Sequence, residues 1–269
     1  MIKTLIVLLF LFLFFSCEES NDISNASPET TAVAGDRPLI VTNINTKIAA
    51  IDSLTEVELQ RVRSLRWEKS TSEGSAFLEV SAYINADEFP QKIAEYFSEP
   101  GYGKEGENIF YFENNELIAV TSLYDEWIDS NTMEVVEQQH FLENGEVTYS
   151  RIKRAAFLDE LADKKWKKIR AEAPSLDRTY KVLRSESPFT TTFISFIQGD
   201  ESLFILLGEP KDEDRYITAL KIDSKDPVLE KLYNNPEEYK YTPFKITFDI
   251  IGGNGTPEFR VLKDIETVD

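Results

Sequence analysis

The chain has 269 residues, 42% of them hydrophobic, so it can build one large core or two ordinary ones. Its 29 basic and 48 acidic residues give a formal charge of −19, which repels nucleic-acid phosphates and disfavours nucleic-acid binding. A single cysteine excludes an intramolecular disulfide and a thiolate cluster for zinc. A single histidine restricts any catalytic triad or multi-histidine metal site, and we expect neither a metal nor a cofactor.

The amino terminus has the order of a signal peptide. Lys3 precedes an unbroken apolar run, residues 5–15, and Ser16, Cys17 and an acidic polar segment follow. As a helix, these 11 apolar residues would cover only about half of a roughly 30 Å hydrocarbon layer, so cleavage is favoured over spanning. We therefore predict a signal peptide at residues 1–16 and then, at residues 17–40, Cys17 with a flexible tether.

The residues Phe14-Phe15-Ser16-Cys17 resemble the lipobox of bacterial lipoproteins. Ser16 matches the small residue of that pattern, whereas Phe14 and Phe15 replace its usual Leu and small residue. The resemblance implies that Cys17 carries acyl chains, such as palmitate, and anchors the protein in the outer membrane, facing the periplasm or the cell surface. The alternative is an ordinary secretory signal with a chance cysteine near its end. The acidic pair Glu18-Glu19 resembles the tags of surface-exported lipoproteins, or else belongs to a solvated tether.

Residues 41–174 predict an antiparallel β-meander with flanking helices. Thr42 or Asn43 can cap a first helix, which apolar residues at helical spacing extend to Leu54. Residues 78–84 then alternate apolar and polar side chains with a period of two, as a half-buried strand does.

Two hairpins and a helix complete this part of the chain. Asn114-Asn115 and Asn144-Gly145 each separate a pair of predicted strands, and Asn-Gly supplies the two positive φ angles of a type I′ turn. A helix with one apolar face is expected from Ala155 to about Arg170, and Pro174 ends it. The proline and the change of pattern after it predict two cooperatively folding units joined at this point.

Residues 175–269 show a different order of elements. We expect a long β segment at Thr179–Gln198, strands at 202–207 and 216–222, a helix that starts at Asp226-Pro227, and strands at 244–250 and 258–265. Three strands, a helix and two further strands resemble the OB-fold, a five-stranded Greek-key barrel. The predicted fold class is therefore α+β, mainly antiparallel β, with a helix and meander followed by a small OB-like barrel.

The single histidine, His140, is expected in a strand on the same face as Val136 and Gln138. Counting outward from the Asn144-Gly145 turn places Tyr149 opposite it on the next strand. A general base needs a positioned nucleophile, and the sequence identifies none, so we expect a structural role for His140.

Acidic residues gather at Asp125, Glu126 and Asp129 and again at residues 212–214, which suits paired acid/base groups or a calcium ion. Neither run has the alternating ligands and the glycine of an EF-hand loop, so we expect solvated loops. The glycine-rich residues 252–255 lack the Lys-Ser or Lys-Thr ending of a phosphate loop and predict a hairpin turn.

One basic run stands out in this acidic chain: Lys164, Lys165, Lys167, Lys168 and Arg170. Glu160 and Asp163 lie four residues before Lys164 and Lys167, so pairing along a helix face explains part of the run. The alternative is a stripe on which a partner docks.

With no catalytic constellation visible, the sequence favours a non-enzymatic binding or interaction module whose ligand is an envelope protein or a glycan. The alternatives are a carboxylate-dependent glycan hydrolase, which needs no His or Cys, an enzyme inhibitor, and a purely structural part of the envelope. Residues 18–175 carry 16 bases and 30 acids, a charge of −14, whereas residues 176–269 carry 12 and 18, a charge of −6. We therefore expect binding at an apolar or neutral surface of the barrel, facing loops 198–201 and 252–257. The oligomeric state stays open.

Overall fold

The structure is a computed structural model that describes residues 37–55, 57–101, 103–199, 202–209, 215–223, 226–253 and 256–268. These residues belong to one compact unit, Asp36–Asp269. The predicted signal peptide and Cys17 lie outside the described residues, as does most of the predicted tether. Within the described ranges, no helix combines the length and the apolar character needed to cross a membrane.

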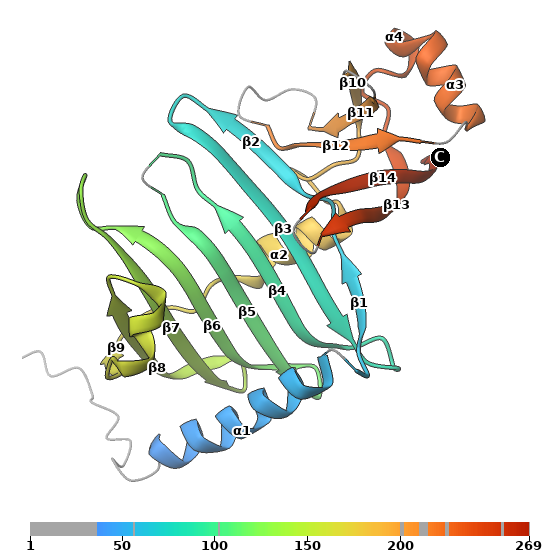
Figure 1. The fold of residues 1–269 in the computed structure, drawn as a ribbon. Coiled ribbons are helices and arrows are strands. Elements are labelled where there is room, and N and C mark those ends of the chain that lie inside the picture. The colour runs from blue at the N-terminus through green and yellow to red at the C-terminus, as the bar shows by residue number, and fades with distance from the viewer. Residues whose placement is uncertain are drawn as a thin grey trace, which may run out of the picture. The chain divides into compact units, whose positions relative to one another are not determined.

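The predicted fold class is confirmed, because antiparallel strands make up most of the described chain and a helix precedes them (Figure 1). The elements up to the predicted boundary are α1 (Arg37–Thr55), β1 (Gln60–Arg63), β2 (Trp67–Thr71), β3 (Gly74–Ile84), β4 (Pro90–Ser98), β5 (Glu105–Glu113), β6 (Glu116–Trp127), β7 (Met133–Glu143), β8 (Glu146–Ala155), the 3-10 helix η1 (Leu158–Asp163) and β9 (Lys167–Ile169). The elements after it are α2 (Leu176–Arg184), β10 (Phe193–Gln198), β11 (Leu203–Gly208), β12 (Ile217–Ile222), α3 (Pro227–Asn234), α4 (Pro236–Tyr239), β13 (Phe244–Gly253) and β14 (Thr256–Thr267).

Strands β3 to β8 form an antiparallel meander in which each strand pairs with the next one in the chain. Both predicted hairpin turns are confirmed, since Asn114, Asn115, Asn144 and Gly145 have positive φ angles of 51°, 66°, 52° and 79°. Strands β1 and β2 both pair with β3 and share one of its edges. Strand β9 pairs with β8 at the far end of the meander.

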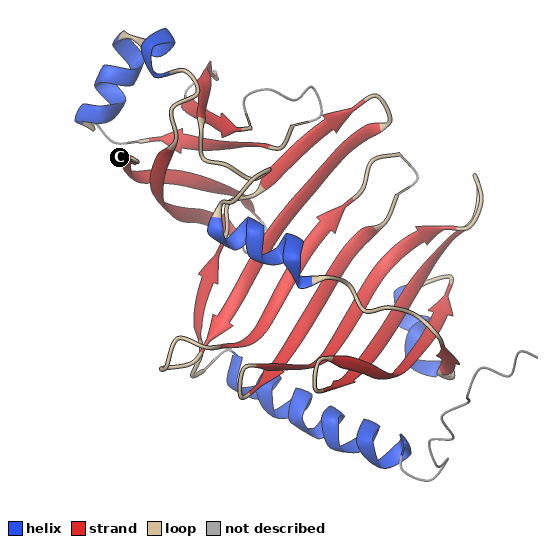
Figure 2. Cartoon of the chain, turned by 180° about the vertical axis from the view of Figure 1, so that it is seen from behind, coloured by secondary structure: helices blue, strands red, loops and turns tan. Residues whose placement is uncertain are grey.

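Side chains alternate between two faces of the meander. One face is covered by α2 and is called the helix face. It carries Val80 and Phe110, which belong to the same core as Val182 of α2, and Figure 2 shows α2 crossing it. The opposite face, called the open face, is seen in Figure 1 and carries Phe141, which packs with Ile44 of α1. Because α1 begins at Arg37, the last residues of the predicted tether are helical.

The five strands after α2 pair in the order β10-β11-β12-β14-β13. The β12–β14 pair is parallel and the other pairs are antiparallel. An isolated bridge between Thr192 and Pro243 connects the residues that precede β10 and β13, so the ends of this order meet. Helix α3 lies between β12 and β13 in the chain, which is the element order that the sequence predicted for a Greek-key barrel.

The helix predicted for Ala155–Arg170 is wrong. Strand β8 continues to Ala155, a short 3-10 helix follows, and residues 167–169 form β9. Two tertiary contacts hold the last part of this segment, around β9, in an extended conformation. Strand β9 forms backbone pairs with β8, and the Trp166 ring lies 4.2 Å from the guanidinium of Arg151. Helical spacing of apolar residues is a weak local preference, and the sheet edge overrides it.

The β segment predicted for Thr179–Gln198 is wrong over its first part, where α2 forms. Ser175 caps α2 by accepting a hydrogen bond from the backbone N–H two residues later, at 3.1 Å. Thr179 and Val182 favour strands by propensity, yet they lie one helical turn apart and are both buried in this helix. Only the last part of the predicted segment, β10, is a strand.

One core extends across the predicted boundary between the two units. It contains Val80 of the meander, Val182 of α2 and Leu220 of β12, all of them buried. In addition, Ile217 of β12 pairs with Glu68 of β2, so the two sets of strands are joined through their backbones. Helix α2 therefore completes the core of the meander although its chain leads into the barrel.

Candidate functional site: a groove at the end of the barrel

The inward-facing side chains of the barrel are apolar, but they are covered unevenly. Ile205 of β11 and Leu220 of β12 are fully buried. Toward one end of the strands, the corresponding residues Phe196, Leu203 and Ile222 are only half-buried. Leu203 and Ile222 are register partners, so their side chains lie on the same face of the sheet. This end of the barrel is incompletely filled by the strands themselves.

Helix α3 lies beside these half-buried residues. The predicted start of the helix is confirmed, because the Asp226 carboxylate accepts hydrogen bonds from the backbone N–H groups of Val228 and Leu229 at 2.7 and 3.3 Å. Pro227 occupies the first turn, where its missing N–H has no cost. Leu229 is buried, and the spacing of three and four residues places Asp226, Leu229 and Tyr233 on one side of the helix.

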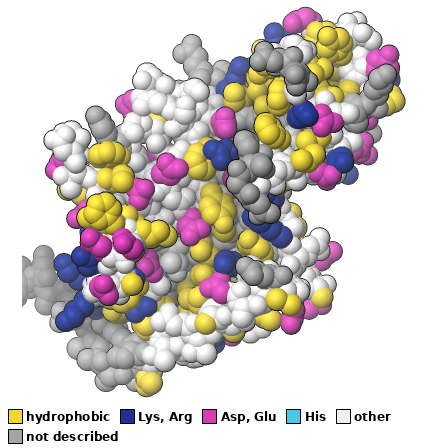
Figure 3. All heavy atoms as spheres, viewed as in Figure 1, with side chains coloured by type: hydrophobic (Ala, Val, Ile, Leu, Met, Phe, Trp, Pro, Cys, Tyr) yellow, Lys and Arg dark blue, Asp and Glu magenta, His cyan; other side chains and the backbone are white. Residues whose placement is uncertain are grey.

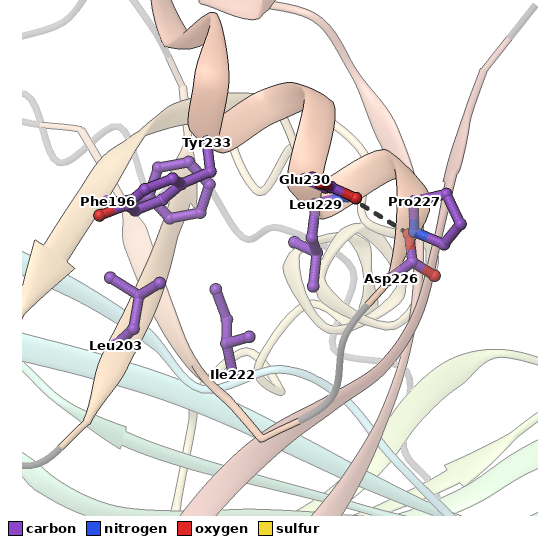
Figure 4. Close-up of a pocket in the computed structure, with 8 residues that line it drawn as sticks. All are labelled: Phe196, Leu203, Ile222, Asp226, Pro227, Leu229, Glu230 and Tyr233. Carbon is purple, nitrogen blue, oxygen red and sulfur yellow. Dashed lines mark hydrogen bonds between the residues drawn. The ribbon is translucent and has the colours of Figure 1, made fainter.

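A groove of about 540 Å³ lies between α3 and the ends of β10, β11 and β12 (Figure 4). Its lining consists of Phe196, Leu203, Ile222, Asp226, Pro227, Leu229, Glu230 and Tyr233. The centroid of the Phe196 ring is 5.2 Å from that of Phe193 and 5.5 Å from that of Tyr233, which makes a row of three rings. Tyr233 is 58% exposed, so the row ends in solvent. Figure 4 shows Phe196 and Tyr233 together at one end of the groove and Asp226 with Pro227 at the other.

The groove belongs to the predicted carboxy-terminal barrel, but α3 rather than a second loop forms its other wall. Phe196 and Leu203 lie on either side of the predicted loop 198–201, of which residues 200 and 201 are outside the described ones. The glycine-rich turn is confirmed as a hairpin, since Gly253 pairs with Thr256, while residues 254 and 255 are also outside. The signal that sequence reasoning missed was the apolar residues of α3 four positions apart.

His140 is fully buried on the helix face of β7, but its predicted partner Tyr149 is wrong. A β-bulge between Phe141 and Leu142 moves the register by one residue, so Ser150 lies opposite His140. The His140 Nδ1 atom is 3.0 Å from Ser150 Oγ, and Nε2 has no hydrogen-bond partner among the described residues. Burial lowers the pKa of His140. Both side chains are enclosed in the core.

Among the described residues, the structure does not bring the predicted carboxylates Asp125, Glu126 and Asp129 together as a cluster. Asp125 and Glu126 are consecutive residues of β6, so their side chains point to opposite faces of the sheet. Burial opposes ionisation of Glu126, but Arg154 at 2.7 Å and Lys104 at 3.4 Å together outweigh burial and lower the pKa of Glu126. Asp129 accepts a hydrogen bond from the backbone N–H of Asn131 in the following turn. Residues 212–214 lie outside the described ones, and the rest of the described chain holds no cluster of three or more potential metal ligands.

The basic run does not form a stripe. Lys164 pairs with Glu160 at 3.2 Å, as predicted. Lys167 and Lys168 lie in β9 instead of a helix, so they point to opposite faces of the sheet.

No protein-family model, no curated protein and no solved structure matches this chain. The geometry of the barrel groove is therefore the basis for a functional proposal.

Proposed function

We propose that this protein is a lipid-anchored, non-enzymatic binding module of the bacterial cell envelope that holds a partner protein in the barrel groove. The observation that carries the proposal is the apolar groove between α3 and the barrel, with its row of aromatic rings. Its volume falls in the range of ligand sites, about 300–1,000 Å³. The lipobox-like residues Phe14-Phe15-Ser16-Cys17 support lipid modification at Cys17 and placement at the outer membrane.

The lining favours an apolar or aromatic side chain of the partner, next to a basic residue. Phe196, Leu203 and Ile222 provide the apolar contact. Glu230 also lines the groove and forms no salt bridge with any described residue, so it can pair with a cation of the partner. Exposed ion pairs contribute less than about 1 kcal/mol, so the affinity comes mainly from the apolar and aromatic contacts.

Site-specific photo-crosslinking tests the proposal. The full-length chain with p-benzoylphenylalanine in place of Tyr233 is irradiated in cells, and the crosslinked peptide is sequenced by mass spectrometry. We expect one discrete partner, joined through a segment that has an apolar or aromatic residue beside Lys or Arg. The matched control is Tyr241, which is 46% exposed and does not line the groove.

A second substitution makes the experiment specific for the groove. Leu203→Trp fills part of the groove and should reduce crosslinking at position 233 by at least fivefold. No adduct at position 233, or equal adducts at positions 233 and 241, would contradict the proposal.

A second candidate function, a carboxylate-dependent glycan hydrolase, is favoured by a cavity of about 580 Å³ on the open face. Glu105 and Asp125 line it and are register partners, so their Cβ atoms lie about 5 Å apart. Glu107 also lines it, and burial raises the pKa of this carboxyl, as a general acid requires. Tyr96 provides an aromatic ring, and Figure 3 shows apolar and acidic side chains side by side on this face.

The release of reducing ends from purified peptidoglycan strands tests the second candidate. Under this candidate, Glu107→Gln abolishes release by the full-length protein, whereas the exposed Glu116→Gln retains it. Failure of the wild-type protein to release reducing ends would remove the candidate.

A further inference from the structure

A row of polar side chains crosses the helix face of the meander between two rows that are mostly apolar. Glu95, Asn108, Ser122 and Gln138 are register partners on the four consecutive strands β4 to β7. Their side chains therefore lie side by side on one face. Such a row inside an apolar face costs free energy unless its groups have hydrogen-bond partners.

Helix α2 satisfies one end of this row. The Glu95 carboxylate is 1% exposed and accepts hydrogen bonds from Arg178 Nε at 2.6 Å and Thr179 Oγ1 at 3.2 Å. It also accepts one from Asn108 Nδ2 at 3.4 Å, while Asn108 Oδ1 accepts one from the Ser122 hydroxyl at 2.7 Å. Gln138, at the other end, has no side-chain hydrogen bond with the described residues. The hydrogen-bonded part of the row therefore stops at Ser122, and the amide of Gln138 next to it is available to a ligand.

A cavity of about 390 Å³ adjoins this row. Asn108, Ser122 and Gln138 line one side of it, and the start of α2 lines another. The rings of Phe97 and Tyr124 add two aromatic surfaces, and Arg178 and Lys104 lie 5.7 Å and 4.4 Å from their respective ring centroids. Neutral amides and hydroxyls beside aromatic rings form a lining that suits a ligand with many hydroxyl groups and an apolar ring face.

The charges around the cavity favour a neutral ligand. Glu95 and Glu99 contribute two negative charges, and Lys104 and Arg178 contribute two positive ones. Arg178 forms an ion pair with Glu95, and Lys104 forms one with Glu126 at 3.4 Å. The cavity is therefore electrically balanced within a chain whose net charge is −19.

We propose that this cavity binds a neutral sugar unit, with Gln138 contacting its hydroxyl groups and Tyr124 or Phe97 packing against its ring, while the buried side chains of Asn108 and Ser122 form the polar base of the cavity. The site lies on the meander, shares no lining residue with the barrel groove, and shares only Tyr124 with the cavity on the open face. The inference thus goes beyond the proposed partner binding and does not depend on it.

Saturation-transfer NMR with the full-length protein in detergent micelles tests the proposal. The probes are the methyl glycosides of glucose, galactose and N-acetylglucosamine at millimolar concentration. We expect transfer to at least one of them in the wild type and at least a tenfold loss in Gln138→Leu, which keeps the side-chain volume but removes the amide.

The neighbouring residue provides a matched control. Gln139 points to the open face, where it accepts hydrogen bonds from Arg151, so Gln139→Leu should retain the transfer. If Gln138→Leu does not fold, Gln138→Ala makes the same comparison by removing the amide. No transfer to any of the three glycosides in the wild type would overturn the proposal. Transfer unchanged by the helix-face substitution, or lost equally in Gln139→Leu, would also overturn it.

Discussion

Arg260 of β14 forms an ion pair with Glu79 of β3, and the Arg260 Nη2 atom lies 2.6 Å from Glu79 Oε2. Both side chains are buried, and the pair connects a barrel strand to a meander strand. Arg63 of β1 also pairs with Glu79, at 2.6 Å, and with Glu258 at 2.8 Å. The Arg260 contact lies outside hydrogen-bond geometry, and burial lowers the pKa of Arg260. The negative charge of Glu79 is therefore the counter-charge of two guanidinium groups, those of Arg63 and Arg260.

Removing that anion should destabilise the protein strongly. Glu79→Ala leaves Arg260 buried without its counter-charge, and breaking a buried pair in this way costs about 3–5 kcal/mol. Urea unfolding at pH 7 measures the loss. As a control, Glu266→Ala breaks a solvent-exposed pair with Lys245 and should cost less than about 1 kcal/mol. Equal effects of the two substitutions would show that the buried network contributes nothing specific.

The continuous core predicts that the two halves of the chain do not fold alone. A fragment of residues 40–174 lacks α2, whose Val182 is 1% exposed in the core that it shares with the meander. A fragment of residues 176–269 exposes the side of α2 that covers the sheet. We expect poorly dispersed amide spectra from both fragments and dispersed spectra when residues 40–269 are intact. Dispersed spectra from both fragments would instead support two independent units.

The stability of the protein should depend on pH through His140. An unfolded histidine takes up a proton below about pH 6.5, whereas burial lowers the pKa of the folded ring. The contribution of the neutral ring is therefore complete above pH 6.5 and is lost as the pH falls toward the lower folded pKa. His140→Gln lacks this proton uptake, so the wild type should lose more unfolding free energy than the variant between pH 7.5 and 5.5. Urea titrations at three pH values measure this, and parallel pH profiles would exclude His140 as the cause.

Membrane attachment should depend on Cys17. The acyl chains that the lipobox resemblance implies would provide stable anchoring, so Cys17→Ser should release the protein into a soluble fraction or stall the precursor. Metabolic labelling with palmitate and carbonate extraction test this in cells. A wild-type protein that takes up no acyl label would exclude lipid modification.

Features set by neighbouring residues could be predicted from the sequence. Asn144 and Gly145 form the expected turn because a type I′ hairpin needs two residues with positive φ angles, whatever surrounds it. Asp226 caps α3 as expected, since its partners are the backbone N–H groups of the next residues. The period-two pattern of residues 78–84 likewise predicted the strand β3, although Glu79 and Ser81, expected on an exposed face, are buried as well.

Features that depend on distant residues were decided only by the tertiary structure. Residues 176–184 form a helix because Val182 and its neighbours bury one helical face against the sheet. Residues 167–169 form a strand because they pair with the edge of β8. One bulge moved the partner of His140 from Tyr149 to Ser150, since a single extra residue shifts the register of everything beyond it. The barrel groove and the polar row across the meander also join residues far apart in the chain, and only the packing of α3 and α2 on their sheets brings those residues together.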